Sequence, residues 1–260
     1  MAEQGKAVRS RKPRAPNASP AARRTQRPRA AARNSDLLYR ELRRDIVSMR
    51  RPPGSPIQEK ELALGHGVSR TPVREAVLRL VEERLIEVVP KSGTFVARIP
   101  ISSLPEALVA RNALEAVTVR AAATNAGPAS VAQLQELLEL QRRSATAGDE
   151  AAFHDADESY HAAIATIGGY PGIWRLIQQM KAQVDRYRRL TLPQPGRMLL
   201  VVEEHAAILE AIAAGEPESA ARRMATHLDK LQIDIAVFRD LWPDYFIHDL
   251  PHEAVKLRNP

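Results

Sequence analysis

From about Leu104 to residue 241, the apolar residues recur at the spacing of α-helices, and no stretch alternates apolar and polar residues as a half-buried strand would. Glycine and proline residues interrupt this pattern and divide it into predicted helices at 104–125, 129–146, 150–167, 171–191, 197–214 and 217–241. Short connections between successive helices are typical of antiparallel packing. We therefore expect residues 104–241 to form an antiparallel all-helical bundle domain.

A second pattern, in residues 35–98, combines three helices with one hairpin. Ser35 can cap a helix that runs to about residue 47, where turn residues follow. A short helix near 59–64 is separated by a glycine-containing turn from a longer helix that begins near Arg70. Two apolar runs within 85–97, joined by Pro-Lys-Ser-Gly, predict a β-hairpin. These elements predict a winged helix-turn-helix domain, so the whole chain is expected to be mostly α-helical.

Composition excludes several classes of protein. The chain contains no cysteine, which excludes disulfide bonds and cysteine ligands for a metal. No apolar run approaches the roughly 18 residues that a membrane span requires, and the N-terminus lacks the apolar core of a secretory signal. Aromatic residues amount to 4%, too few for a large base-stacking surface. We expect a cytoplasmic protein that has no membrane partner.

Charge is distributed unevenly, although the 260 residues together carry only +7. Residues 1–35 hold ten Lys/Arg and one acid, which is +9. Residues 36–98 hold twelve basic and nine acidic residues, a net charge of +3. Residues 99–260 hold sixteen basic and twenty-one acidic residues, a net charge of −5. The part of the chain after the tail therefore carries a net charge of −2. This asymmetry favours nucleic-acid contact at the N-terminal end only. Sequence recognition must then depend on a few placed residues rather than on overall charge.

The segments outside the two domains have simple interpretations. Residues 1–34 are rich in Ala, Arg, Pro and Ser, and they predict a disordered basic tail. This tail either neutralises DNA phosphates without sequence preference or is a solvated leader. Residues 98–103 are expected to link the two domains, and residues 242–260 to form a C-terminal tail.

The second helix of the helix-turn-helix presents polar side chains where such a helix enters the major groove of DNA. Arg70, Thr71 and Arg74 lie in its first turns. An arginine at this place can donate two hydrogen bonds to O6 and N7 of guanine. The alternative interpretation is that the two arginines belong to a solvated helix face.

The residues around this helix resemble the GntR family of bacterial transcription regulators. The resemblance is carried by the run GVSRTPVREA at 67–76, by Pro53-Gly54 before it, and by GTFV at 93–96 after it. It implies DNA contacts to bases, phosphates and the minor groove from Lys60, Ser69, Arg70, Thr71, Arg74 and Gly93. Lys60 stands where arginine is common in the family, and lysine offers a point charge rather than a planar fork.

Four residues of the predicted bundle can converge on a metal ion. Asp157 and His161 lie one helical turn apart on the same face. His205 and His227 lie in the two last predicted helices. One carboxylate and three imidazoles suit Zn²⁺, Ni²⁺ or Mn²⁺ with coordination positions left open. Each histidine taken alone is equally compatible with a core or partly exposed polar residue.

Three nearby side chains are rivals for the ligand positions. His154 precedes Asp157 by three residues, whereas His161 follows it by four. Glu158 and Glu204 each adjoin a candidate ligand in the sequence, and a neighbouring residue points about 100° away around a helix. We therefore prefer the set of Asp157 and the three later histidines.

The same region resembles the FCD ligand-binding domain of the FadR subfamily. The resemblance covers roughly 104–240 and is carried by RNALE at 111–115, DESYH at 157–161, EHAAIL at 204–209 and HL at 227–228. It implies that the one aspartate and three histidines named above are metal ligands. The chain departs from the family at 169–170, where Gly-Tyr replaces a common Gly-Asn.

Arg111 is the candidate contact for an anionic effector, because a cation near a metal can bind the far end of a carboxylate. The alternative is an ion pair with Glu115, which lies one helical turn further on. A solvated or dimer-contacting face is instead expected for Arg186, Arg188 and Arg189.

The sequence therefore predicts a dimeric regulator, acting as a repressor, that binds double-stranded operator DNA. A small organic or sugar acid, bound at a divalent metal site, would change the operator affinity. One rival is a metal-dependent enzyme that uses the Asp/His₃ set, although no His-Glu-x-x-His motif is present. Another rival is a regulator whose metal is purely structural or is itself the signal.

Overall fold

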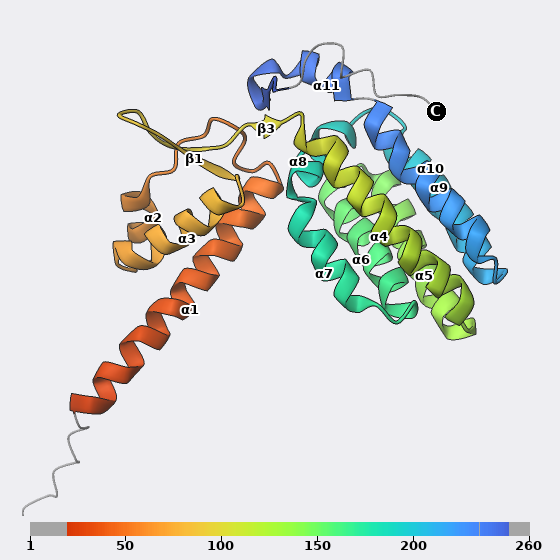
Figure 1. Ribbon diagram of the computed structural model, residues 1–260, viewed down its shortest axis with the longest axis horizontal. Coiled ribbons are helices and arrows are strands. Elements are labelled where there is room, and N and C mark those ends of the chain that lie inside the picture. Colours follow the sequence, from red (N-terminus) through yellow and green to blue (C-terminus); the bar gives the residue numbers. More distant parts are fainter. Residues whose placement is uncertain (1–19, 234, 250–260) are drawn as a thin grey trace, which may run out of the picture.

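A computed structural model of the chain describes residues 20–233 and 235–249. A smaller α/β part lies at the N-terminal side and a helical bundle lies beside it, with a few C-terminal turns across one end (Figure 1). No helix within the described residues has the length and apolar character needed to cross a membrane. The mostly α-helical class is confirmed.

The N-terminal part is a winged helix-turn-helix. Its elements are α1 (Pro20–Val47), α2 (Glu59–Gly65), α3 (Arg70–Glu82), β1 (Ile86–Val89) and β2 (Gly93–Val96). The two strands pair antiparallel, with Val89 opposite Gly93. Leu38, Leu42 and Ile46 lie on one face of α1 and pack against the buried face of α3. This apolar contact holds the outer face of α3 toward solvent.

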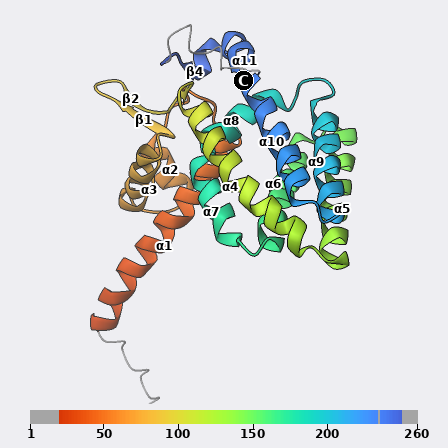
Figure 2. The same ribbon diagram turned by 45° about the vertical axis from the view of Figure 1, so that its right-hand side comes forward.

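Helix α1 begins earlier than the sequence predicted. The prediction placed a disordered tail up to residue 34 and a helix start at Ser35, whereas the helix begins at Pro20. Alanine and arginine, which favour helix, make up ten of the fifteen residues from 20 to 34, and Pro20 lies in the first turn, where proline is tolerated. The first part of α1 projects away from the rest of the molecule (Figures 1 and 2). Residues 1–19 of the predicted tail lie outside the described residues.

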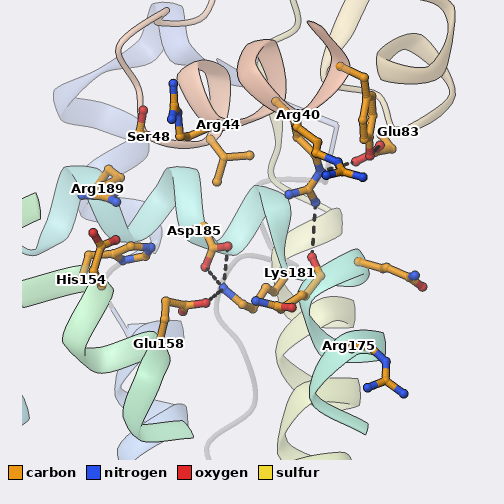
Figure 3. Close-up of a pocket in the computed structure, with 16 residues that line it drawn as sticks. Arg40, Arg44, Ser48, Glu83, His154, Glu158, Arg175, Lys181, Asp185 and Arg189 are labelled. Atoms are coloured by element: carbon orange, nitrogen blue, oxygen red, sulfur yellow. Dashed lines mark hydrogen bonds and ion pairs between the residues drawn. The ribbon is translucent and has the colours of Figure 1, made fainter. Parts of the chain in front are cut away.

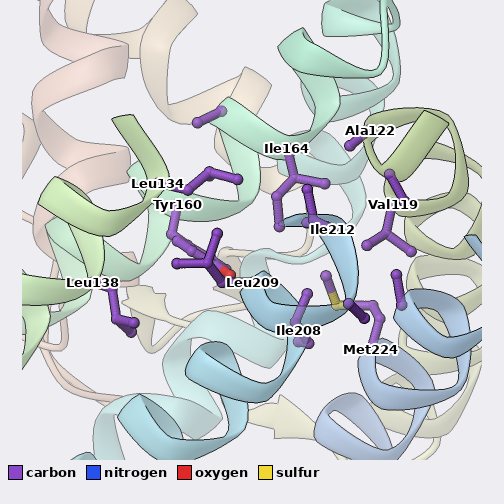
Figure 4. Packing of buried hydrophobic residues seen from close by; sticks show 14 of the residues in the cluster. Val119, Ala122, Leu134, Leu138, Tyr160, Ile164, Ile208, Leu209, Ile212 and Met224 are labelled. Carbon is purple, nitrogen blue, oxygen red and sulfur yellow. The ribbon is translucent and has the colours of Figure 1, made fainter. Parts of the chain in front are cut away.

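The bundle is built from helices whose bounds follow the glycine and proline breaks. They are α4 (Ser103–Asn125), α5 (Pro128–Ala147), α6 (Glu150–Ile167), α7 (Pro171–Met180), α8 (Ala182–Thr191), α9 (Arg197–Ala213) and α10 (Pro217–Ile233). Tyr160, Ile164, Ile208 and Met224 belong to one apolar cluster at its centre (Figure 4). Helix α10 packs against both α4 and α9. The polar residues of α6, α9 and α10 that share this interior are therefore brought close together.

One predicted helix is divided, and another is described in two parts on either side of residue 234. The helix predicted at 171–191 breaks at Lys181 into α7 and α8, although no glycine or proline marks that position. Lys181 is only 1% exposed and its ammonium group is held by two carboxylates, so tertiary contacts stabilise the break. The helix predicted at 217–241 becomes α10 and α11 (Ile235–Leu241).

The predicted linker and C-terminal tail hold each other in place. Strand β3 (Ile99–Pro100) pairs in parallel with β4 (Phe246–Ile247), which follows the 3₁₀ turn η1 (Pro243–Tyr245). Ser102 donates its hydroxyl and its backbone N–H to Asp249. Phe246 is 1% exposed. Burial of this aromatic side chain orders a segment that the sequence predicted as a tail, while residues 250–260 lie outside the described residues.

Candidate metal centre and nucleic-acid interface

The predicted DNA contacts are all accessible to solvent on the winged helix. Lys60 is on α2, while Arg70, Thr71 and Arg74 occupy the first turns of α3. The full set of six residues is exposed: Lys60, Ser69, Arg70, Thr71, Arg74 and Gly93. Within the described chain, the lysine and the two arginines of this set form no ion pair with the protein's own acids. Their charges are available to a polyanion.

The backbone orients both parts of this surface. Gly67, between α2 and α3, has φ +62, a left-handed conformation that glycine adopts without strain. In the wing, Lys91 has φ +63 and Gly93 has φ +139. Only glycine readily adopts the second value, so this position of the wing requires glycine. The exposed tip also carries the basic side chain of Lys91.

Three of the four predicted metal ligands meet inside the bundle. His161 comes from α6, His205 from α9 and His227 from α10, and all are buried. One nitrogen from each lies within 4.8 Å of one from each of the others. The Nε2 atoms of His205 and His227 are 3.2 Å apart. The helical packing therefore collects three imidazoles around one point.

Each imidazole is oriented by an acceptor on its other nitrogen. His161 Nδ1 donates to Glu115 at 2.5 Å, and His227 Nδ1 donates to Glu204 at 2.6 Å. His205 Nδ1 donates at 2.7 Å to the side-chain oxygen of Gln141, whose amide nitrogen donates to the carbonyl of Ala156. These acceptors hold each ring through Nδ1, so that each Nε2 atom faces the other rings.

The residues present fit a metal ion. His161 Nε2 is buried and makes no hydrogen bond in the described structure. The Nε2 lone pairs of His205 and His227 face each other, an arrangement that a cation between them would stabilise. Burial lowers the pKa of both histidines, and the mutual proximity of the rings lowers that of His205 further. Neutral imidazoles with oriented outer nitrogens are what a bound metal requires.

Asp157, the fourth predicted ligand, lies beside the three histidines with its carboxylate held by Arg188. The two guanidinium contacts measure 2.5 and 2.8 Å, and Oδ1 is 3.9 Å from His205 Nε2. Burial would raise the pKa of Asp157, but the charge and hydrogen bonds of Arg188 outweigh it and hold the pKa well below its ordinary value. The carboxylate is therefore ionised and close to the ring nitrogens.

The structure contains the ion pair that was the alternative interpretation of Arg111. Its Nε donates to Glu115 at 2.5 Å, as the intrahelical alternative predicted. Its two terminal nitrogens are buried without a hydrogen-bond partner in the described structure. Glu115 also accepts from His161, so Arg111 is connected to the histidine cluster through one carboxylate. The two terminal nitrogens of Arg111 are therefore available to a second acceptor.

The rival ligands occupy other places. His154, Glu158 and Asp185 form a separate cluster, and Lys181 already fills it with contacts of 2.6–2.7 Å to the two acids. Glu204 contacts the outer nitrogen of His227 rather than the common centre. Neither glutamate named as a rival belongs to the histidine cluster.

The sequence reasoning missed the residues that orient this site. Gln141 and Glu204 each hold one histidine, but only the packing of α5, α9 and α10 brings them there. The expectation for the arginines of α8 was wrong, because Arg186 is fully buried and Arg188 is 2% exposed. Arg189 is partly buried. Each of the two buried guanidinium groups binds an acceptor from a distant element, which no local pattern indicates.

A winged helix with an accessible recognition helix, joined to a helical domain with a buried polar centre, defines a DNA-binding transcription regulator with a ligand-binding domain. Residues 34–96 match "Bacterial regulatory proteins, gntR family", and residues 106–230 match the FCD domain. The chain belongs to the GntR family and carries an FCD domain, which implies binding of an effector. Members of this family are transcription regulators and not enzymes, so the enzyme alternative is set aside.

Relatives and solved structures agree with this assignment. The chain is 33% identical over 212 residues to an "Uncharacterized HTH-type transcriptional regulator in unstable DNA locus" of Streptomyces ambofaciens, covering 82% of this chain and 89% of the relative. It is 30% identical over 209 residues to the "HTH-type transcriptional repressor RspR" of Escherichia coli, covering 80% and 92%. The structure of E. coli McbR/YncC has a TM-score of 0.67 at 25% identity and covers 80% of this chain and 98% of the other.

Proposed function

We propose that this protein is a dimeric, cytoplasmic repressor whose operator affinity is set by a small carboxylate effector bound beside a divalent metal in the FCD domain. The observation that carries this proposal is the convergence of His161, His205 and His227, each with its outer nitrogen held by an acceptor. Metal-ligating histidines characteristically donate their other ring nitrogen to an acceptor of this kind, which supports a ligand role for these three.

The proposed ligands of the metal are the three histidines and Asp157, and Zn²⁺, Ni²⁺ and Mn²⁺ all suit this donor set. When bound, such an ion supplies an electrophilic centre that a carboxylate oxygen can approach. Asp157 is ionised and 3.9 Å from the nearest ring nitrogen. Glu115, Gln141 and Glu204 keep the rings in the required tautomer.

Two buried arginines favour a carboxylate as the effector. The two terminal nitrogens of Arg111 are buried without a hydrogen-bond partner in the described structure. The Nε atom of Arg188 is likewise buried without a hydrogen-bond partner there. Burial and the nearby charge of Arg188 both lower the pKa of Arg111, but the carboxylate of Glu115 outweighs them and the net shift is upward. A guanidinium edge with two open N–H groups suits a two-point contact with a carboxylate. An organic or sugar acid would satisfy buried donors that are costly to leave unpaired.

Helix α8 offers a route from the metal centre to the winged helix. Arg188 on this helix holds Asp157, while Gln183 donates to the carbonyl of Arg84 and Arg186 donates at 2.5 Å to that of Ala97. A ligand that changes the Asp157–Arg188 contact would alter the position of α8 and hence of the recognition helix. Coupling free energies for such effects are typically about 1–3 kcal/mol.

On DNA, a dimer would place two α3 helices in successive major-groove segments of a roughly palindromic operator. Arg70 and Arg74 would read bases or phosphates, together with Lys60, Ser69, Thr71 and the wing-tip Gly93. Repression is supported by a relative that is named as a transcriptional repressor, RspR of E. coli. In this proposal, binding of the effector releases the protein from its operator.

The test combines metal analysis with an operator titration. Protein purified with each metal is expected to hold one ion per chain by mass spectrometry, and a screen of organic and sugar acids by thermal shift is expected to find one that stabilises only the metal-loaded form. That acid should then change operator affinity by about 5–150-fold in a binding titration. If chelation unfolds the protein but no carboxylate changes operator affinity, the metal is structural and the effector proposal fails.

A further inference from the structure

A cleft of about 1150 Å³ lies between the winged helix and the bundle, away from the histidine cluster. One wall is the last part of α1, with Arg40, Arg44 and Ser48, and the other wall comes from α6, α7 and α8 (Figure 3). We infer that this cleft is a second ligand site, and that it takes a small molecule bearing two acidic groups. This site is separate from the proposed metal-linked effector site.

Most acids that line the cleft are neutralised by neighbours. Glu83 accepts hydrogen bonds from Arg43, at 2.7 Å, and from Tyr39. Lys181 forms ion pairs of 2.7 and 2.6 Å with Glu158 and Asp185. These groups interact with one another, and because one lysine faces two carboxylates they leave a net formal charge of −1.

The cleft has more arginines without a close ion pair than acids without one. Arg40 and Arg175 make no ion pair within the described chain, and the one pair of Arg44, with Asp45, is long at 3.9 Å. Arg189 has its Nε buried without a hydrogen-bond partner. Against these four arginines stand Asp155 and the one excess negative charge of Lys181, Glu158 and Asp185, so the lining carries a net formal charge of +2. The cleft is therefore cationic, and the arginines stand on both walls.

His154 provides an independent sign of a missing partner. This residue lines the cleft at its inner end, beside Arg189, and is only 6% exposed (Figure 3). Its Nδ1 makes no hydrogen bond in the described structure. A buried polar atom without a partner is costly. A ligand oxygen at this place would satisfy both the imidazole and the guanidinium of Arg189.

The distribution of donors defines the class of ligand. One acidic group would lie near His154 and Arg189 on the bundle, and the other near Arg40 and Arg44 on α1. Charge-assisted contacts at both ends would hold the two domains at one relative angle. The winged helix carries the recognition helix, so occupancy of the cleft would change operator affinity without any contact to the metal centre.

The experiment is a calorimetric titration of fructose 1,6-bisphosphate, a compact molecule with two phosphates, into the full-length protein at constant ionic strength. Wild-type protein is expected to bind it saturably, with 1:1 stoichiometry. Arg44→Gln and Arg189→Gln are each expected to weaken binding at least tenfold. The matched control is Arg143→Gln, which removes an exposed charge of α5 outside the cleft and should leave the affinity unchanged.

Absence of saturable binding to the wild type, or equal affinity in all four proteins, would overturn the assignment. Metal content is measured on the same samples and should be equal in wild type, Arg44→Gln and Arg143→Gln. A wild type that binds the bisphosphate but contains no metal would refute the proposed effector site while leaving the cleft site intact. The two proposals are thus tested separately.

Discussion

Asp157 of α6 and Arg188 of α8 form a fully buried two-point ion pair, with contacts of 2.5 and 2.8 Å. This pair joins the helix that carries His161 to the helix that binds backbone carbonyls of the winged helix. The histidine cluster and the DNA-binding domain are therefore separated by one helix and one ion pair.

Removing one partner of this pair should destabilise the protein strongly. Arg188→Leu leaves Asp157 buried and uncompensated, and the expected loss in free energy of unfolding is about 3–5 kcal/mol. The double variant with Asp157→Leu should recover a large part of this loss, because no unpaired charge remains. Urea denaturation followed by circular dichroism measures both. Similar stabilities for single variant and wild type would contradict the pairing.

Loss of one histidine should remove the metal without unfolding the bundle. His205→Ala deletes a ligand at the centre of the cluster, so metal content measured by mass spectrometry should fall well below one ion per chain. His248→Ala, outside the cluster, is the matched control and should retain full stoichiometry. Unchanged metal content in His205→Ala would exclude this residue as a ligand.

The recognition helix can be tested through one exposed arginine. Arg74→Ala removes a side chain that makes no internal ion pair, so the fold should be unaffected, while specific operator affinity should fall by about 1–3 kcal/mol or more. Footprinting and circular dichroism on the same preparation separate the two effects. A retained footprint at wild-type protein concentration would show that α3 reads the operator in another way.

The N-terminal tail should contribute charge rather than specificity. Deleting residues 1–33 removes ten Lys/Arg and one acid, and the slope of log K against log salt should become shallower by about 0.9 for each phosphate that the tail neutralises in the full-length protein. Operator preference over random DNA should change little. An unchanged slope would identify the tail as a solvated leader.

His154 should make stability depend on pH in acid. Burial, followed by the charges of Arg188 and Arg189, lowers its pKa from 6.5 to about 3. Below pH 6.5, His154 is protonated in the unfolded chain but stays neutral in the folded protein. The free energy of unfolding therefore falls by about 1.4 kcal/mol per pH unit until the pH approaches the pKa of His154 in the folded protein. His154→Gln should lose this slope between pH 6 and 4 in urea titrations. An identical slope in the variant would show that His154 titrates normally.

Much of the fold follows from local patterns. The helical period and the glycine and proline breaks predicted α4, α5, α6 and α9 to within a residue or two of their bounds. The break at Lys181 was missed because no local signal marks it; the ammonium group is held by Glu158 and Asp185 from two helices. Likewise, nothing in residues 242–260 indicates that Phe246 pairs with the strand at Ile99.

Residue type and spacing made Asp157, His161, His205 and His227 candidates, as they did Arg70 and Arg74 of the recognition helix, and the family resemblance then favoured these residues over the alternatives. Only the tertiary structure decided what surrounds them. Gln141 orients His205 across 64 residues of sequence, and Arg188 reaches Asp157 across 31. Helical spacing specifies which side chains share a face, because the backbone geometry is local. Partner identity, burial and pKa depend on how separate helices pack, and that is a property of the folded chain as a whole.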